Sequence, residues 1–282
     1  MPQQTPLFSF GVIADVQYCD CPPSPVRFYR KSTDKLQECI TTLNKQDLAF
    51  TLDLGDLIDR DFSSFATILS EYKSLNARVY RTLGNHDYSV APERLADVPA
   101  QVGLHPSGYY DFVYLGWRFI VLNGNEVSVF SNLPQSEAYQ QAEKLLEKLQ
   151  QQGAPNANEW NAGVSQQQLT WLEQRLREAQ SAGQKVIVSG HYPLYPEDPH
   201  NLWNAEAVIS RLEQPGNVVA YFNGHNHAGN YGQKKGIHYV NFKGMIDTPD
   251  QNTFAAIHVH TDHLEMQGFG REDSRELSFS VR

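Results

Sequence analysis

Long hydrophobic segments are absent from this sequence. No apolar run approaches the ~20 residues that a helix needs to cross a bilayer, so we expect no transmembrane segment and no membrane partner. Residues 1–10 lack a basic stretch followed by a long apolar one, so no signal peptide is predicted. Low-complexity composition is also missing, because hydrophobic residues make up 40% of the chain and charged residues 20%, which indicates a folded protein.

Cysteine is scarce. The three cysteines, Cys19, Cys21 and Cys39, all lie near the amino terminus, and their C-x-C spacing fits neither a zinc ribbon nor a redox motif. Because disulfides are rare in the cytosol, we expect reduced thiols in a cytoplasmic protein. A disulfide or a soft-metal site is the alternative.

Basic residues are fewer than acidic ones. The chain has 23 Lys and Arg against 32 Asp and Glu, which gives a formal charge of -9. Binding to long nucleic acids needs a basic surface, so we expect no nucleic-acid partner. The 282 residues would suit two domains of ~150 residues, although single α/β domains often reach this length.

Short apolar runs that end at polar residues indicate buried strands. Five such runs lie at residues 7–14, 48–54, 79–83, 186–188 and 218–222. Helical periodicity is found at residues 30–43, 63–72, 135–152 and 165–182, the last opening on a capping-box pattern of Ser165 and Gln168. The last third predicts strands at residues 236–242, 254–260 and 263–269. The loop at 153–158 is no domain boundary, because candidate ligands lie on both sides of it.

Each of the first five runs ends at side chains that bind divalent metals. In chain order these ends read Asp15-x-Gln17, Gly55-Asp56, Gly84-Asn85-His86-Asp87, Gly190-His191 and Gly224-His225-x-His227. Carboxylates, amide oxygens and imidazoles are ligands of first-row divalent ions, and functional groups gather at the carboxyl ends of strands in α/β sheets. One such residue alone is more often a polar side chain leaving the core. Five in this order predict a metal centre.

This order of motifs resembles the calcineurin-like metallophosphoesterase superfamily. Gln17, in place of the usual histidine of the first motif, is similar to the manganese-dependent ADP-ribose/CDP-alcohol diphosphatase family. The stretches at residues 13–18, 27–30, 191–196 and 244–249 resemble that family too, so the similarity runs over essentially the whole chain.

The resemblance implies two divalent metal ions that share Asp56. Two-metal hydrolases hold their ions ~3.5–4 Å apart and stabilise both the attacking and the leaving oxygen. Because the amide oxygen of Gln17 is harder than an imidazole, Mn²⁺ is the expected ion, with Mg²⁺, iron and zinc as alternatives. The implied ligands are Asp15, Gln17, Asp56 and His227 for one ion, and Asp56, Asn85, His191 and His225 for the other.

The resemblance also implies catalytic roles beside the metals. His86 follows the ligand Asn85 and is expected to protonate the leaving oxygen or to bind the phosphate. Asp59 is expected to orient His86, and Asp87 is the rival for that task. Substrate contacts are expected from Tyr18, Arg60, Tyr195, His200 and Tyr231. The stretch at residues 21–26 is shorter and richer in proline than the loop the family usually carries there, which leaves the substrate range open.

The family's fold is a four-layer α/β/β/α sandwich of two mixed sheets, and we expect one such α/β domain over residues 1–282. The implied function is hydrolysis of the phosphoanhydride of a small nucleotide diphosphate, such as ADP-ribose or a CDP-alcohol. A phosphodiesterase or phosphomonoesterase on the same metals is the alternative, and an inactive scaffold is the rival from another class. We expect a cytoplasmic monomer.

Overall fold

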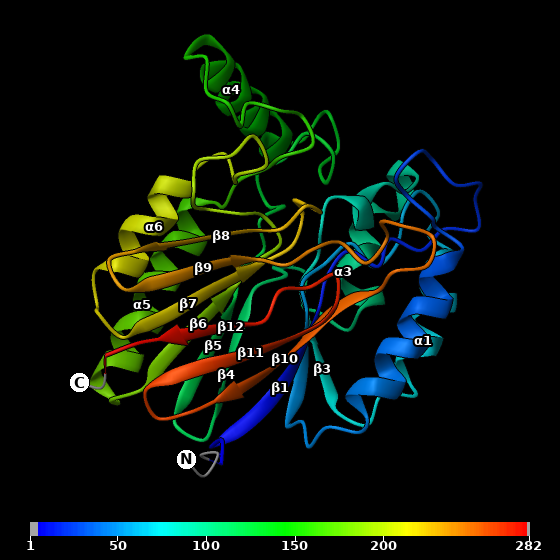
Figure 1. Ribbon diagram of the computed structural model, residues 1–282. Helices are drawn as coiled ribbons and strands as arrows, with labels where there is room; N and C mark the ends of the chain where they lie inside the picture. Colours follow the sequence, from blue (N-terminus) through cyan, green and yellow to red (C-terminus); the bar gives the residue numbers. More distant parts are fainter. Residues whose placement is uncertain (1–4, 281–282) are drawn as a thin grey trace.

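Twelve strands form two mixed sheets that pack face to face, as the computed structural model describes for residues 5–280 (Figure 1). Three neighbouring strands of the first sheet, the last of them at its edge, run parallel to one another. Four neighbouring strands of the second sheet also run parallel. In spatial order the first sheet is β12 (Arg275–Ser278), β11 (His263–Gly270), β10 (Thr253–Val259), β1 (Phe8–Ile13), β2 (Phe50–Asp53) and β3 (Arg78–Arg81). The second is β4 (Tyr110–Tyr114), β5 (Trp117–Val121), β6 (Lys185–Ser189), β7 (Val218–Asn223), β9 (Ile237–Asn241) and β8 (Asn230–Lys234).

Helices cover both outer faces. The helices α1 (Lys31–Leu43) and α2 (Ser64–Tyr72) pack on the first sheet, while α5 (Gln166–Ser181) and α6 (Ala205–Glu213) pack on the second (Figure 1). The short α3 (Val98–Gln101) follows β3, and α4 (Glu137–Gln151) extends away from the sheets. The predicted four-layer α/β/β/α sandwich is confirmed.

The core between the sheets is largely aromatic. Phe10 stacks on Phe50 with ring centroids 5.1 Å apart, and Phe119 of the other sheet meets Phe50 edge to face at 4.9 Å. Residues on the opposite face of β1, such as Ile13, pack against the helices. Both faces of β1 are therefore buried, which explains why it reads as a continuous apolar run and does not alternate.

The predicted elements are found with ends shifted by a few residues, but some elements were missed. The missed strands β4 and β8 lie at edges of the second sheet and are half exposed, so they carry no apolar run. The prediction also passed over β5, β12 and the short α6.

The predicted capping box at α5 is only half formed. The Ser165 hydroxyl accepts the backbone N–H of Gln168 at 3.1 Å. The Gln168 side chain turns away, however, and its amide donates to Asn123 O and to the carboxylate of Glu126. That same carboxylate accepts the Ser165 N–H at 3.0 Å, so Glu126 supplies the bond expected from Gln168.

The expectation of three reduced thiols is corrected. Cys19 and Cys21 form a disulfide, because the loop after Gln17 brings their Cα atoms to 5.3 Å, while Cys39 is free and buried. No helix in residues 5–280 is long and apolar enough to cross a membrane. The single-domain prediction extends over residues 1–4 and 281–282, which lie outside the described part.

Candidate metal centre

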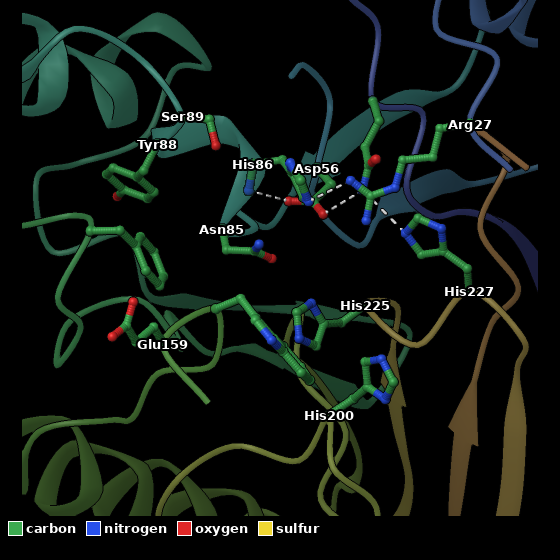
Figure 2. A pocket seen from close by; sticks show the side chains of 13 residues that line it. Arg27, Asp56, Asn85, His86, Tyr88, Ser89, Glu159, His200, His225 and His227 are labelled. Atoms are coloured by element: carbon green, nitrogen blue, oxygen red, sulfur yellow. Dashed lines mark hydrogen bonds between the residues drawn. The ribbon is translucent and has the colours of Figure 1, made fainter. Parts of the chain in front are cut away.

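The carboxyl ends of the parallel strands of both sheets meet at one place. Asp15 follows β1, Asp56 follows β2, Asn85 follows β3, His191 follows β6 and His225 follows β7. The structure brings all seven predicted ligands together there, in two adjoining groups that share Asp56. Figure 2 labels four of them, Asp56, Asn85, His225 and His227.

Several of these ligands adopt the left-handed backbone conformation, which is unfavourable for residues other than glycine. The φ angles are 53° at Asp15, 45° at Gln17, 57° at Asp56 and 71° at His225. Such strain is typical of functional sites, where it aims a side chain that regular strand geometry would point elsewhere.

Two glycines make room for the carboxylates. A Cβ atom on Gly84 would collide with the carboxylate of Asp56, and one on Gly224 would come within 2.5 Å of Asp15 Oδ2. Neither glycine has a positive φ angle. Their role is to allow this close approach.

The first group contains Asp15, Gln17, Asp56 and His227. The Gln17 amide nitrogen lies 2.9 Å from Asp56 Oδ2 and 3.1 Å from His227 Nε2, and His227 Nε2 lies 3.7 Å from Asp15 Oδ1. Ligand atoms about 2.1 Å from an ion in octahedral geometry lie about 3 Å apart, so this spacing suits one metal ion.

The second group contains Asp56, Asn85, His191 and His225. His191 Nε2 lies 3.3 Å from Asp56 Oδ2 and 3.2 Å from Asn85 Oδ1. The ligand atoms of Asp56, His191 and His225 lie within 4.8 Å of one another. Asp56 thus contributes to both groups, as a bridging carboxylate would.

Gln17 provides a test of whether these residues fit a metal. Its Oε1 atom is buried and has no hydrogen-bond partner, while its Nε2 atom occupies the place between Asp56 and His227. The oxygen and nitrogen of an amide exchange places on a flip of the side chain. The flipped amide directs its oxygen to the two partner ligands, and a cation between them satisfies all three groups. The donor set therefore fits a divalent ion.

The tautomers of the three histidine ligands are set by the groups behind them. His191 donates Nδ1–H to Leu54 O at 2.8 Å, and His227 donates Nδ1–H to Asp247 Oδ1 at 3.0 Å. His225 is reversed, because its Nε2 lies 2.9 Å from Asn161 Oδ1. The free lone pairs are therefore on Nε2 of His191 and His227, and on Nδ1 of His225. The supporting hydrogen bonds also orient the three rings.

The amide orientation of Asn161 is not arbitrary. Its Nδ2 donates to Asn156 O at 2.9 Å and to Pro199 O at 2.7 Å, so both N–H groups are used on carbonyls. Oδ1 must therefore face His225, and His225 must donate from Nε2. The buried Asn161 thus determines which nitrogen of His225 faces the metal position.

His86 lies beside the two groups with its ring held from both sides. Its Nδ1 lies 3.0 Å from Asp59 Oδ1, and Arg27 Nη1 lies 3.1 Å from its Nε2 (Figure 2). Since arginine can only donate, His86 accepts at Nε2 and donates from Nδ1, as a neutral imidazole does. The geometry thus favours Asp59 as the residue that orients His86.

Asp87, the rival for that role, faces the backbone. Its two carboxylate oxygens accept the N–H groups of Asp56, Leu57, Ile58 and Gly84 at 2.8 to 3.2 Å. This fully buried side chain joins the loop after β2 to the loop after β3. Its role is to hold two ligand loops together.

A cavity of about 580 Å³ opens over the centre. Of the five predicted substrate contacts, His200 lines this cavity, and Tyr18, Arg60, Tyr195 and Tyr231 are not among its lining residues. Its lining comprises Gln17, Arg27, Asp56, Asn85, His86, Tyr88, Ser89, Phe130, Glu159, Trp160, His200, His225 and His227.

The four predicted contacts outside the cavity have other partners. Arg60 lies over the ring of Tyr29, and the Tyr231 hydroxyl bonds the ring of His238 at 2.9 Å. Tyr195 lines a separate cavity of about 310 Å³, and Tyr18 packs into the core between the first sheet and its helices. Sequence adjacency to a ligand motif does not tell on which side of the loop a side chain points.

Comparison with known proteins places these observations in a family. The calcineurin-like phosphoesterase family model matches residues 8–229. The chain belongs to the calcineurin-like phosphoesterase family. It is 32% identical to the mouse manganese-dependent ADP-ribose/CDP-alcohol diphosphatase and 31% identical to the Arabidopsis thaliana protein of that name. These alignments cover 97% and 96% of this chain, and 94% and 97% of the relatives.

A solved structure agrees with the sequence relatives. The crystal structure of a dimetal phosphatase from Danio rerio superposes with a TM-score of 0.87 and 26% identity, covering 98% of this chain and all of that one. The predicted resemblance is thereby confirmed, and this calcineurin-like phosphoesterase is a metal-dependent phosphohydrolase.

Burial and neighbouring charges shift the pKa values at the centre of the phosphoesterase. Burial alone would raise the pKa of Asp56, but the charge of His191 and its hydrogen bond to this carboxylate act against burial, and the pKa lies well below its usual range. Burial lowers the pKa of His225 far below that of a free histidine. Asp56 is therefore ionised and His225 neutral, which is the state that each needs as a metal ligand.

Sequence reasoning about the phosphoesterase missed three site residues. Arg27 contacts His86, Asp247 holds His227, and Asn161 holds His225. Arg27 and Asp247 lie in stretches that resemble the family, at residues 27–30 and 244–249, so the sequence carries a signal for them. Asn161 lies in a loop more than 60 residues from His225 along the chain, and no local pattern marks it.

Proposed function

We propose that this phosphoesterase hydrolyses the phosphoanhydride of nucleoside diphosphate-linked compounds, such as ADP-ribose and CDP-alcohols, to a nucleoside monophosphate and a second phosphate monoester. The observation that carries the proposal is that Asp56 belongs to both ligand groups, while Arg27 and His86 line the same cavity. The names of the mouse and Arabidopsis relatives support the substrate class and manganese.

The seven ligands would hold two divalent ions, Mn²⁺ in our proposal, since two carboxylates and two amide oxygens make the set rich in hard donors. Bound divalent ions of this kind activate water at neutral pH and offset the charge of phosphate oxygens. The substitution Gln17→His would reduce the preference of the site for Mn²⁺ over zinc.

The protein's own residues act on the leaving phosphate. Arg27 carries a fixed positive charge at the cavity wall and is placed to bind a phosphate oxygen. His86, neutral and oriented by Asp59, is placed to donate or accept one hydrogen bond there. A departing phosphate has a second pKa near ~6, so it leaves without full protonation. A neutral His86 is therefore sufficient for a diphosphate substrate.

The arrangement also leaves room for phosphodiester or phosphomonoester hydrolysis, because the metal ligands and Arg27 meet only phosphate. The shape of the cavity favours a diphosphate, since it continues past the centre to Tyr88 and Glu159. We further propose a single domain over residues 1–282 and a monomeric protein. The cytoplasmic location expected from reduced thiols is at odds with the Cys19–Cys21 disulfide.

A substrate panel tests the proposal. Chelator-treated protein supplied with Mn²⁺ is assayed on ADP-ribose, CDP-choline, cyclic AMP and p-nitrophenyl phosphate, with identification of the products. We expect AMP with ribose 5-phosphate, and CMP with phosphocholine, at rates far above those on the other two compounds. Faster release of inorganic phosphate from p-nitrophenyl phosphate would instead identify a phosphomonoesterase.

A further inference from the structure

The segment at residues 244–248 contacts two ligands of the first group. It lies between β9 and β10 and passes beside the start of α1 (Figure 1). The carboxylate of its Asp247 accepts from His227, and two of its backbone N–H groups donate to His227 O at 3.1 Å and to Asp15 O at 2.9 Å. A displacement of this segment would therefore move both ligands.

The same segment pairs with the stretch that carries Arg27. Asp247 forms an isolated antiparallel bridge with Arg27, and the Phe28 N–H donates to Ile246 O at 3.1 Å. Ile246 is fully buried and packs against Tyr29. The 244–248 segment thus positions a cavity-lining arginine as well as the first ligand group.

A buried lysine of α1 holds this segment from behind. Lys35 is only 4% exposed, and its ammonium donates to Met245 O, to Asp247 O at 2.9 Å and to Thr248 O at 3.0 Å. An ammonium has three N–H groups, so these three bonds use all of them. Burial lowers the pKa of Lys35 to about 8, which leaves it a cation at pH 7.

The backbone conformation that Lys35 stabilises is not one the segment favours by itself. The φ angle of Thr248 is 62°, in the left-handed region that is unfavourable for a β-branched residue. This turn brings three carbonyl oxygens to one place, and the buried ammonium offsets their mutual repulsion. Arg271 holds the beginning of the segment, because its Nη2 donates to Gly244 O at 2.6 Å.

We propose that Lys35 is a positioning residue for the metal centre, which fixes Asp247 behind His227 through the 244–248 segment and so sets the affinity of the first ligand group. Its hydrogen bonds go to the segment and not to a ligand. This inference rests on the proposed function, since it requires two bound ions, and deepens it by assigning control of one ion to a residue outside the cavity.

Calorimetric titration of metal-free protein with Mn²⁺ measures the affinity for each ion without any substrate. Lys35→Met keeps a long, unbranched side chain and removes all three donors. Lys35→Gln keeps two N–H donors on a shorter side chain, and it takes the place of Lys35→Met if urea unfolding shows that the latter does not fold. Lys31→Met, at an exposed position on the same helix, is the matched control for the loss of one charge.

We expect the parent to bind two ions. In Lys35→Met one ion should bind about tenfold more weakly while the other is unchanged, and Lys35→Gln should weaken the same ion by a smaller factor. Lys31→Met should behave as the parent.

A second comparison places Lys35→Met in two backgrounds. If Lys35 acts through Asp247, the added loss in Asp247→Ala should be less than about threefold, because the contact that Lys35 positions is already gone. In Asn161→Ala, which affects His225 in the second group, the first ion should still lose about tenfold. A lysine that only supports the fold would give the same loss in both backgrounds.

The outcomes that overturn the inference are distinct from failure of the proposed function. Unchanged affinities in the folded Lys35 variant, equal weakening of both ions, or equal losses in the two backgrounds would each refute the positioning role and leave the proposed function standing. A parent that binds fewer than two Mn²⁺ ions would contradict the proposed function, and the inference would fail with it.

Discussion

At the scale of single residues, the metal centre depends on the groups behind its ligands. Leu54 O, Asp247 and Asn161 each accept an N–H from one histidine. His225 therefore leaves Nδ1 free for a metal, whereas His191 and His227 leave Nε2 free. A change behind a ligand should therefore alter metal affinity without touching the ligand itself.

Asn161→Ala tests this dependence. Without the acceptor, the tautomer and orientation of His225 are no longer set, and we expect the affinity for Mn²⁺ at the second group to fall by about 10–100-fold. Asn158→Ala is the control, because Asn158 also bonds Pro199 O but does not contact His225. Titration calorimetry with Mn²⁺ measures both, and equal affinities in the two variants would contradict the role of Asn161.

His86→Ala separates substrate classes. An alkyl or aryl phosphodiester has a leaving group that needs a proton, whereas the leaving phosphate of a diphosphate does not. We expect a larger loss of kcat on diphenyl phosphate, whose phenolate is a poor leaving group without a proton, by about 10²-fold or more, than on ADP-ribose. Equal losses on the two compounds would show that His86 does not act through the leaving group.

At this scale the sequence predicted that the seven candidate ligands lie together, but it did not predict which side chains line the cavity. A ligand such as Asp56 comes directly after an apolar strand, and that position on the chain fixes its place at the strand end. A contact such as Tyr231 depends on which way one side chain turns, and the structure turns it to His238. Trp160 lies in a loop without periodicity, so no pattern pointed to it.

At the scale of elements, one buried carboxylate joins two strand-end loops. Asp87 accepts four backbone N–H groups from the loops after β2 and β3, which carry Asp56 and Asn85. The spacing of the two ligands is thus set by this contact as well as by the pairing of β2 with β3.

Asp87→Asn should loosen both loops. The amide can accept at one oxygen only, so N–H groups on its other side lose their partner in a buried place, and we expect the free energy of unfolding to fall by about 2–3 kcal/mol. Asp61→Asn is the control, since Asp61 accepts one N–H at the exposed residue Ser63. Urea unfolding compares them, and a similar effect of the two substitutions would contradict this account.

Elements with a strong pattern were predicted from the sequence, and weakly patterned ones were not. Strands buried on both faces, such as β1 and β7, give continuous apolar runs. The edge strands β4 and β8 bury only part of their side chains and give no such signal. The pairing of distant strands, such as β1 with β10, follows from packing and not from local sequence.

At the scale of the whole molecule, the acidic charge and the anionic substrate are compatible. The formal charge of -9 belongs to the chain as a whole. Two divalent ions, when bound, would bring four positive charges to the centre, and Asp15 and Asp56 would offset about two of them. The site attracts phosphate locally, while the acidic total favours solubility and disfavours long nucleic acids.

The pH dependence of stability should reflect Asp53. Burial raises the pKa of Asp53 to about 6, so the folded chain binds this proton more tightly than the unfolded chain, whose carboxyl has a pKa of about 4. The stability that Asp53 contributes is therefore present below pH 4 and is lost as the pH rises through 6.

Asp53→Asn removes this titration. We expect the free energy of unfolding of the variant, relative to the parent, to rise by about 2 kcal/mol between pH 4.5 and pH 7.5. Asp47→Asn, at an exposed position, should show no such trend. Urea unfolding at both pH values measures the difference, and a constant difference for Asp53→Asn would contradict the raised pKa.

The central claim is that two manganese ions held around Asp56 support cleavage of a diphosphate. The most direct test is to strip the phosphoesterase with a chelator, titrate it with Mn²⁺, and measure bound metal and the products from ADP-ribose in the same samples. The account predicts no activity without metal, full activity at two ions per chain, and AMP with ribose 5-phosphate as the products. Full activity with tightly held zinc and no response to Mn²⁺ would contradict it.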